Sequence, residues 1–235
     1  MDKKLLLWDI DGTLMSCYMD GTLALNETFR RRTGHENACG EVIVGTAMDS
    51  ALVDRIMMRF SIPPEEKPQI ITEFAGILRE IVANNQTKRV LPGVREILDR
   101  LKSRKDVCMG LITSNFRIGA EIKLDSVGLL DYFTFGGFGD TPGEKWDAAR
   151  NAIEKAEKII GGSFCRENIY VIGDTKYDIL CGKKNGVKTV AVATGWADIE
   201  TLKAEKPDYL LESLEDTEGF LEIVLGLAPE GENEV

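Results

Sequence analysis

Short apolar runs recur along this chain and alternate with segments of helical periodicity. The first run, residues 5–8, stops at Asp9, and a short continuous apolar run that ends in a turn is typical of a strand buried on both faces of a parallel sheet. Comparable runs lie at residues 107–112, 169–172, 189–193 and 209–211. Residues 94–101 and 146–160 carry apolar side chains at the i, i+3, i+4, i+7 spacing of helices. The alternation predicts an α/β fold whose core is a doubly wound, Rossmann-like parallel sheet.

One long segment, residues 17–87, breaks this alternation. Within it, residues 52–60 and 70–82 each place apolar side chains on one helical face, and Pro63-Pro64 separates the two stretches. This pattern predicts a smaller α-helical domain inserted into the sheet domain.

The insertion sets the expected domain boundaries. The core comprises residues 1–16 and 88–228, and we expect hinges near residues 17–21 and 84–88. The acidic end of the chain, residues 229–235, is expected to be a flexible tail.

Composition and charge narrow the function classes. The 235 residues carry a net charge of −10, which repels polyanions, so we expect neither nucleic acid nor a membrane surface as a partner. No segment approaches the roughly 18 apolar residues of a membrane span, and the charged start with its short apolar run is unlike a signal peptide. We therefore expect a cytoplasmic protein. The sequence leaves open whether it is a monomer or a homodimer. Its five scattered cysteines suggest neither a disulfide framework nor a zinc site.

Asp9 and Asp11 stand two residues apart where the first expected strand ends. The period of two directs both carboxylates to the same side, and Gly12 permits a sharp turn that exposes them. Like charges this close raise each other's pKa unless a cation neutralises them, and Mg²⁺ prefers such oxygen ligands. An isolated Asp-x-Asp-Gly is more often an ordinary turn with a capping aspartate, so other residues must decide its meaning.

Four motifs that follow one another along the chain favour a functional role for Asp9 and Asp11 over an ordinary turn. They are Asp-Ile-Asp-Gly-Thr at residues 9–13, Leu-Ile-Thr-Ser-Asn at 111–115, Lys145 at the start of a helical segment, and Ile-Gly-Asp-Thr-Lys-Tyr-Asp at 172–178. Each alone is a weak signal, but the ordered set is strong. The chain resembles the haloacid dehalogenase superfamily over nearly its whole length, and it is similar to the phosphoglycolate-phosphatase-like branch, which has a helical cap between the first and second motifs.

The resemblance implies roles for the four aspartates. Asp9 is the nucleophile that forms an aspartyl-phosphate, and Asp11 protonates the departing alkoxide and then deprotonates the attacking water. Mg²⁺ is held by Asp9, the backbone carbonyl of Asp11 and Asp174, with Asp178 as a direct or water-bridged partner. Asp174 could instead cap a helix, and Asp178 could be a solvent-facing acid in a first helical turn.

The resemblance also implies a phosphate-binding set. Thr113, Ser114 and Asn115 follow the second motif's strand and contact the phosphoryl oxygens, with the Thr113 hydroxyl as a donor. Lys145 supplies a positive charge in the transition state. Lysine is abundant in this chain, so Lys123 competes for this role. Many relatives have Lys-Pro at the third motif, whereas this chain has Lys-Trp. Backbone amides of Ile10 and Asn115 are further candidates.

Two groups of basic residues in the insert are expected to lie outside the site. His35, the single histidine, is predicted to be a surface residue. The arginines at 30–32 are predicted to form a solvated helix face, although one of them could reach the substrate from the cap.

The predicted function is a Mg²⁺-dependent phosphatase acting on a small phosphorylated metabolite. A dehalogenase is disfavoured, because relatives that displace halide have no acid at the position of Asp11. A sugar phosphomutase keeps both aspartates and remains an alternative. A non-catalytic, phosphate-binding regulatory protein is the alternative from another class, although such a protein could dispense with Asp9 or Asp11.

Overall fold

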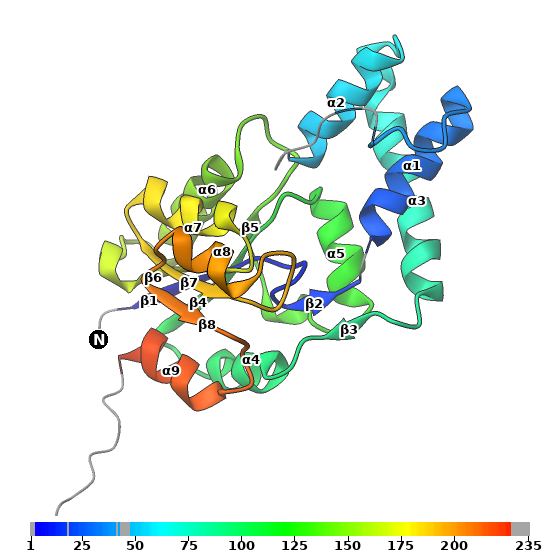
Figure 1. The fold of residues 1–235 in the computed structure, drawn as a ribbon. Coiled ribbons are helices and arrows are strands. Elements are labelled where there is room, and N and C mark those ends of the chain that lie inside the picture. Colours follow the sequence, from blue (N-terminus) through cyan, green and yellow to red (C-terminus); the bar gives the residue numbers. More distant parts are fainter. Residues whose placement is uncertain (1–2, 18, 41, 43–47, 227–235) are drawn as a thin grey trace, which may run out of the picture.

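A computed structural model describes residues 3–17, 19–40, 42 and 48–226. In this part of the chain, six strands form one sheet in the order β5-β4-β1-β6-β7-β8, and all neighbouring pairs are parallel (Figure 1). The strands are β1 (Lys4–Trp8), β4 (Val107–Ile112), β5 (Gly136–Gly137), β6 (Ile169–Gly173), β7 (Lys188–Val192) and β8 (Tyr209–Leu211). The five predicted strands and the parallel α/β fold are therefore confirmed.

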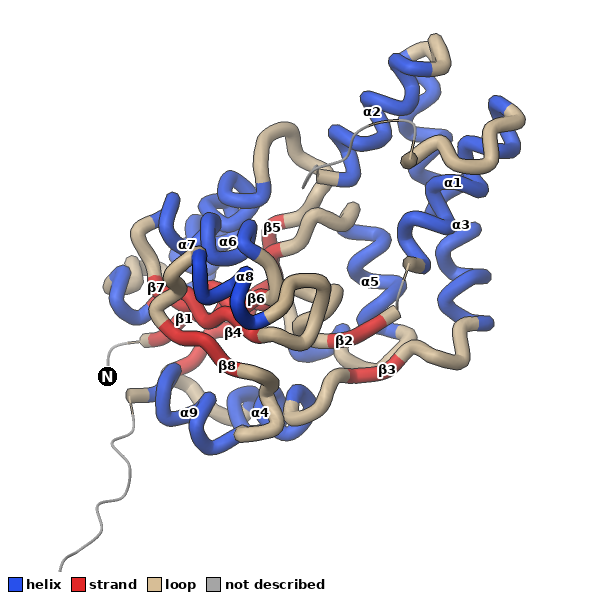
Figure 2. Tube along the Cα trace, in the orientation of Figure 1, coloured by secondary structure: helices blue, strands red, loops and turns tan. Residues whose placement is uncertain are grey.

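Helices cover both faces of this sheet (Figure 2). Leu6 and Trp8 of β1 belong to the apolar cluster that contains α4 and α9, whereas Leu5 and Leu7 belong to the cluster that contains α6 and α7. The helices are α4 (Val94–Lys102), α6 (Lys145–Ile160), α7 (Lys176–Asn185), α8 (Ile199–Ala204) and α9 (Thr217–Leu225). The unbroken apolar run of β1 follows from this arrangement, because successive side chains of a strand enter opposite layers.

The predicted helical insertion is present between β1 and β4. Its described residues include α1 (Asp20–Thr33), α2 (Asp49–Arg59) and α3 (Lys67–Asn84), which share an apolar core of their own. Two short antiparallel strands, β2 (Met15–Ser16) and β3 (Arg89–Val90), lie where the chain leaves and re-enters the sheet domain. The residue boundaries of the insert stay predictions, and the tail at 229–235 lies outside the described residues.

Helix α5 (Arg117–Asp125) lies between the sheet domain and the insert (Figure 1). Its Ala120 and Leu124 pack in the core of the sheet domain. Phe116, Ile118 and Ile122 pack with the apolar core of the insert. This helix therefore joins the two cores, and a side chain on it can act at their junction.

Two further expectations concerned membrane spans and the state of the cysteines. Across the described ranges, no helix has both the length and the apolar character needed to cross a membrane. The cysteines are free: Cys17, Cys39 and Cys181 are buried, Cys108 is half-buried and Cys165 is exposed.

Candidate active site

The sequence-predicted residues converge at the carboxyl edge of the sheet. Asp9 follows β1, Thr113 follows β4 and Asp174 follows β6, so parallel strands bring all three to one edge. Lys145 is the first residue of α6, and Asp178 lies in the first turn of α7. All five are buried, from 0% exposed for Thr113 and Asp174 to 7% for Lys145.

Asp9, Asp174 and Asp178 form an acidic cluster. Each offers one carboxylate oxygen, and these oxygens lie within 4.8 Å of one another. Lys145 Nζ is 2.7 Å from Asp9 Oδ1 and 2.7 Å from Asp178 Oδ1. Three carboxylates against one ammonium leave two net negative charges, which match a divalent cation. Buried oxygen ligands of this kind are those that hard cations prefer, so the cluster fits a metal site.

The pKa values of the aspartates in this cluster reflect its burial and its excess of negative charge. Burial raises the pKa of Asp9 well above its usual range, and Asp178 and Asp174 raise it further against the opposing charge of Lys145. Burial, followed by the nearby Asp178, raises the pKa of Asp174 to about 6. A bound cation would relieve this crowding, because it stabilises the ionised carboxylates.

Asp174 and Asp178 owe their positions to the start of α7. The N-cap of this helix is Thr175, whose backbone amide donates to Asp178 Oδ2 at 3.0 Å in a capping box. Asp174 precedes the cap and accepts from the Trp196 amide at 3.0 Å and the Thr13 hydroxyl at 3.4 Å. The interpretation of Asp174 as the helix cap is therefore wrong, and Asp178 is buried rather than solvent-facing.

Two glycines allow the chain to pass close to Asp174. Gly12 has a φ of +87°, which suits glycine, and a Cβ there would lie 2.5 Å from Asp174 Oδ2. A Cβ at Gly195 would lie 1.7 Å from the same oxygen. The turn at Gly12 was predicted from the sequence, whereas the role of Gly195 was not.

The side chain of Asp11 belongs to a second cluster beside the first. It accepts from Lys123 Nζ at 2.7 and 2.9 Å, from Asn115 Nδ2 at 2.8 Å and from Cys17 Sγ at 3.2 Å. Burial alone would raise the pKa of Asp11, but Lys123 and the hydrogen bonds outweigh it and lower the pKa. The carboxylate is thus held by its own partners, and ligation of a metal through its backbone carbonyl stays a prediction.

The loop after β4 presents a hydroxyl toward the acidic cluster. Thr113 Oγ1 accepts from the Asn115 amide at 3.1 Å and from Asn115 Nδ2 at 2.6 Å, so its hydroxyl proton is left to donate. Thr113, Ser114 and Asn115 line one cavity together with Asp9 and Lys145. The Asn115 amide, predicted to contact phosphate, is directed to Thr113 instead.

The two candidate lysines occupy different places. Lys145 contacts Asp9, the predicted nucleophile, whereas Lys123 on α5 contacts Asp11. Lys145 begins α6 with Trp146 as its neighbour, and Glu144 and Asp147 form a capping box around this helix start. Lys145 therefore belongs to the acidic cluster, and Lys123 has a separate partner.

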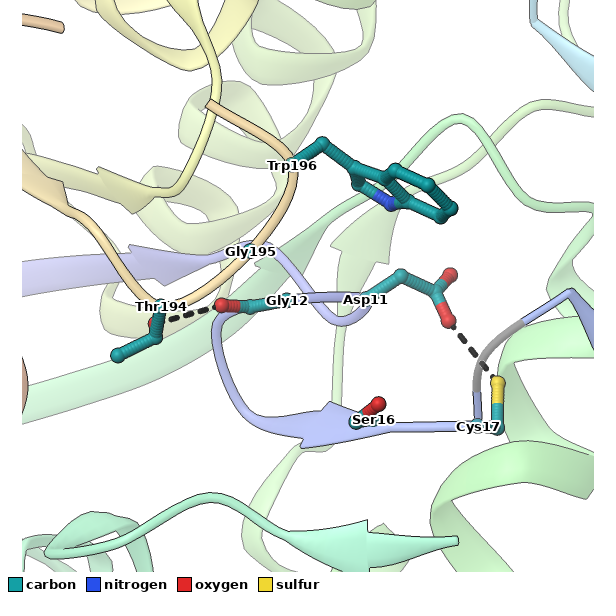
Figure 3. A pocket seen from close by; sticks show the side chains of 7 residues that line it. All are labelled: Asp11, Gly12, Ser16, Cys17, Thr194, Gly195 and Trp196. Carbon is teal, nitrogen blue, oxygen red and sulfur yellow. Dashed lines mark hydrogen bonds between the residues drawn. The ribbon is translucent and has the colours of Figure 1, made fainter. Parts of the chain in front are cut away.

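Several residues of the site were not predicted from the sequence. Thr194 follows β7 at the same sheet edge, and its hydroxyl donates to the Gly12 carbonyl at 2.6 Å. Trp196, 67% exposed, extends beside Asp11 from this loop (Figure 3). Asp49 of α2 accepts from the Phe116 amide at 2.8 Å. The position of Thr194 and Trp196 after the apolar run at 189–193 was the available signal, whereas nothing in the local sequence marks Asp49.

His35 and the arginines at 30–32 do not line the cavity of Asp9 and Lys145, and three of these four residues are exposed as predicted. His35 is exposed, and its ring centroid is 4.5 Å from that of Phe60. Arg30 and Arg31 bind Glu27 of the same helix. Arg32 is not fully solvated, because it binds Glu73 of α3 at 2.7 Å.

Comparison with known proteins gives a consistent result. Residues 6–192 match the family of haloacid dehalogenase-like hydrolases. The chain is 30% identical to a putative pyrophosphatase PpaX of Caldanaerobacter subterraneus, over 89% of this chain and 90% of that protein. It is 26% identical to a phosphoglycolate phosphatase of Aquifex aeolicus, over 88% and 92% of the two chains.

A solved structure shares the fold. The crystal structure of a predicted phosphoglycolate phosphatase from Haemophilus somnus superposes with a TM-score of 0.67 at 22% identity, covering 94% of this chain and 98% of that one. Because the family match spans most of the chain, including all four motifs and both candidate lysines, the assignment does not rest on fold alone. The chain belongs to the haloacid dehalogenase-like hydrolases and is an enzyme of their phosphatase type, close to the phosphoglycolate phosphatase and PpaX branch.

Proposed function

We propose that this protein is a Mg²⁺-dependent phosphatase that hydrolyses a small phosphomonoester through an aspartyl-phosphate on Asp9. The observation that carries the proposal is the contact between Asp9 and Lys145 inside the acidic cluster, with Thr113 beside it. The relatives' names, a phosphoglycolate phosphatase and a pyrophosphatase, support a small phosphorylated substrate.

The first half of the reaction transfers the phosphoryl group to the protein. A carboxylate oxygen of Asp9 attacks phosphorus while the bond to the alcohol oxygen breaks. The lowered pKa of Asp11 makes its protonated carboxyl the minor form, and it is this form, positioned by Lys123 and Asn115, that gives its proton to the departing alkoxide. Lys145 stabilises the charge on the phosphoryl oxygens.

The second half of the reaction releases phosphate. Asp11, now ionised, accepts a proton from water, and the resulting nucleophile attacks phosphorus as the bond to the Asp9 oxygen breaks. Thr113 donates to a phosphoryl oxygen throughout. Mg²⁺ held by Asp9, Asp174 and Asp178 would supply positive charge that offsets both the carboxylates and the phosphoryl group.

The helical insert is placed to act as a cap. The amides of Asp49 and Ser50, at the start of α2, donate to the carbonyls of Ser114 and Gly139 at 2.9 and 3.0 Å. The first bond joins the insert to the loop that carries Thr113, and the second joins it to the loop after β5. We infer that closure of the insert excludes bulk water from the aspartyl-phosphate, and that opening releases products.

Phosphate release is the direct test of this function. We expect Mg²⁺-dependent release of inorganic phosphate from a generic ester such as nitrophenyl phosphate, and loss of that release when EDTA removes the metal. Incubation with sugar phosphates separates the alternatives: a phosphomutase would interconvert phosphate isomers without releasing phosphate. Absence of both release and isomerisation would favour the regulatory, phosphate-binding alternative.

The metal site can be tested without measuring activity. A ligand that binds only the native state at about 100 times its Kd adds about 2.7 kcal/mol to the free energy of unfolding. For a chain of this size, that corresponds to a rise in Tm of about 5–10 °C. We therefore expect Mg²⁺ to raise the Tm measured by calorimetry.

Asp174→Asn provides the matched comparison for the metal site. Losing one carboxylate relieves the charge crowding, so the variant without Mg²⁺ should unfold at or above the wild-type temperature. Its Mg²⁺-induced rise in Tm should fall below half the wild-type value. Asp125→Asn, at an exposed position on α5, should keep the full rise. An Asp174→Asn variant that responds to Mg²⁺ like the wild type would remove Asp174 from the metal site.

A further inference from the structure

Three cavities meet around Asp11, on the side of the site where the alcohol of a phosphomonoester departs. One of them, of about 210 Å³, lies between the sheet domain and the insert and is lined by Asp49 and Lys123 as well as Asp11. The other two are also lined by Asp11 and Trp196. Figure 3 shows the one that Gly12 and Thr194 line as well. Sites for drug-sized ligands have roughly 300–1,000 Å³, so the first cavity suits a small alcohol.

The ammonium groups that line these cavities are already engaged. Within the described ranges, the positively charged residues among their linings are Lys123 and Lys145. An ammonium has three donors, and Lys123 Nζ is 2.7 and 2.9 Å from the Asp11 oxygens and 2.8 Å from Asn115 Oδ1. Lys145 lies against Asp9, where the phosphoryl group arrives. Lys123 therefore has no donor left for an anion on the alcohol.

Among the described residues of the insert, no lysine, arginine or histidine lines these three cavities. Arg30 and Arg31 bind a glutamate of their own helix, and Arg32 binds Glu73 of α3. None of these arginines lines the three cavities. The segment before α2, residues 41–47, contains no lysine, arginine or histidine in its sequence.

The surface of the cavity between the domains suits an uncharged, hydroxylated group. Asp49, half-buried, adds a second carboxylate to that of Asp11, so the two carboxylates outnumber the single ammonium of Lys123. A carboxylate or a second phosphate placed here would meet like charge without a free cation. Hydroxyl groups of a ligand can donate to the Asp49 carboxylate, and Leu25 and Leu52 give the cavity an apolar surface for its carbon atoms.

We propose that the substrate is a phosphomonoester of an uncharged polyhydroxy alcohol, such as a polyol or a sugar, and that the site discriminates against leaving groups that carry a carboxylate or a second phosphate. This inference rests on the proposed phosphatase function. Two features of the cavities determine the substrate class. Among the described residues, no cation beside Asp11 is free to bind an anion, and Asp49 adds a second carboxylate.

Matched substrate pairs test the proposal. Glycerol phosphate and phosphoglycerate have the same carbon skeleton and differ in a hydroxymethyl group against a carboxylate. Hydroxyethyl phosphate and phosphoglycolate form a second such pair, and pyrophosphate tests a phosphate leaving group. We expect kcat/KM to be at least about tenfold higher for the uncharged member of each pair and lowest for pyrophosphate.

A variant that adds a positive charge tests whether the lack of a free cation causes the preference for uncharged leaving groups. Thr22 of α1 lines the cavity between the domains and is partly exposed. Thr22→Arg adds the missing cation, so it should raise kcat/KM for phosphoglycerate relative to glycerol phosphate by at least about tenfold. Thr22→Gln, of comparable length and no charge, should leave the wild-type ratio unchanged.

The possible outcomes separate this proposal from the function on which it rests. Preference for phosphoglycolate or pyrophosphate over the uncharged esters would overturn the substrate class while leaving the phosphatase function intact. An unchanged ratio in Thr22→Arg would show that charge in this cavity does not set specificity, which also overturns the proposal. Lack of phosphate release from every substrate, nitrophenyl phosphate included, would defeat the phosphatase function and the proposal with it.

Discussion

Replacing Asp9 with asparagine should lower the rate of phosphate release by at least about 1,000-fold. The amide keeps the shape of the side chain but cannot attack phosphorus, so no aspartyl-phosphate forms. The fold should persist, because burial and then repulsion from Asp178 and Asp174 raise the pKa of Asp9, and the uncharged amide avoids both costs. Steady-state phosphate release with Mg²⁺ present measures the effect.

Two comparisons make the Asp9 result specific. Asp125→Asn makes the same chemical change at an exposed position on α5 and should retain wild-type kinetics. Acid-quenched wild-type protein, digested and analysed by mass spectrometry, should carry a phosphoryl group on the peptide that contains Asp9. An Asp9→Asn variant that releases phosphate within about tenfold of the wild-type rate would rule out Asp9 as the nucleophile.

Lys145→Met should lower kcat/KM by about 100–1,000-fold. The ammonium lies 2.7 Å from Asp9 and 2.7 Å from Asp178, so its loss removes the positive charge nearest to the phosphoryl group. The variant should also be less stable by about 3–5 kcal/mol, because it leaves buried carboxylates without their partner. Kinetics should therefore be measured well below the Tm of the variant, with folding checked by circular dichroism.

Lysines elsewhere in the chain provide the controls for this result. Lys158 lies on an exposed face of the same helix, and Lys158→Met should leave both kinetics and stability near wild type. Lys123→Met removes the partner of Asp11 instead of that of Asp9. If Lys123→Met lost more activity than Lys145→Met, and Lys145→Met lost less than about tenfold, the assignment of Lys145 to the phosphoryl site would be wrong.

Strands and motifs were predictable because their signals are local. The runs at 107–112 and 169–172 became β4 and β6, and the polar residues that follow them, Thr113 and Asp174, meet at one sheet edge. β5 escaped prediction because it consists of two glycines, which have little strand preference and pair only because β4 presents a free edge. The α3 face at 70–82 was strongly periodic and was confirmed.

Contacts between distant segments were not predictable in the same way. The roles of Asp174 and Asp178 at the start of α7 depend on which residue becomes the N-cap, and Thr175 takes that position instead of Asp174. The contact of Trp196 with Asp174 depends on the loop after β7 passing within reach of β6. These contacts depend on how helices, strands and loops pack against one another, and local sequence patterns do not predict that packing.

By itself, the sequence determined the sheet, the inserted helices and the set of reactive side chains at strand ends. It could do so because apolar periodicity fixes which residues are buried, and parallel strands must bring their carboxyl ends to one edge. Only the tertiary structure decided how the charges pair: Lys145 with Asp9, and Lys123 with Asp11 across 112 residues of sequence. Pairing of charges depends on distances of a few ångströms between helices and loops, because that is the range over which an ammonium and a carboxylate form a hydrogen bond.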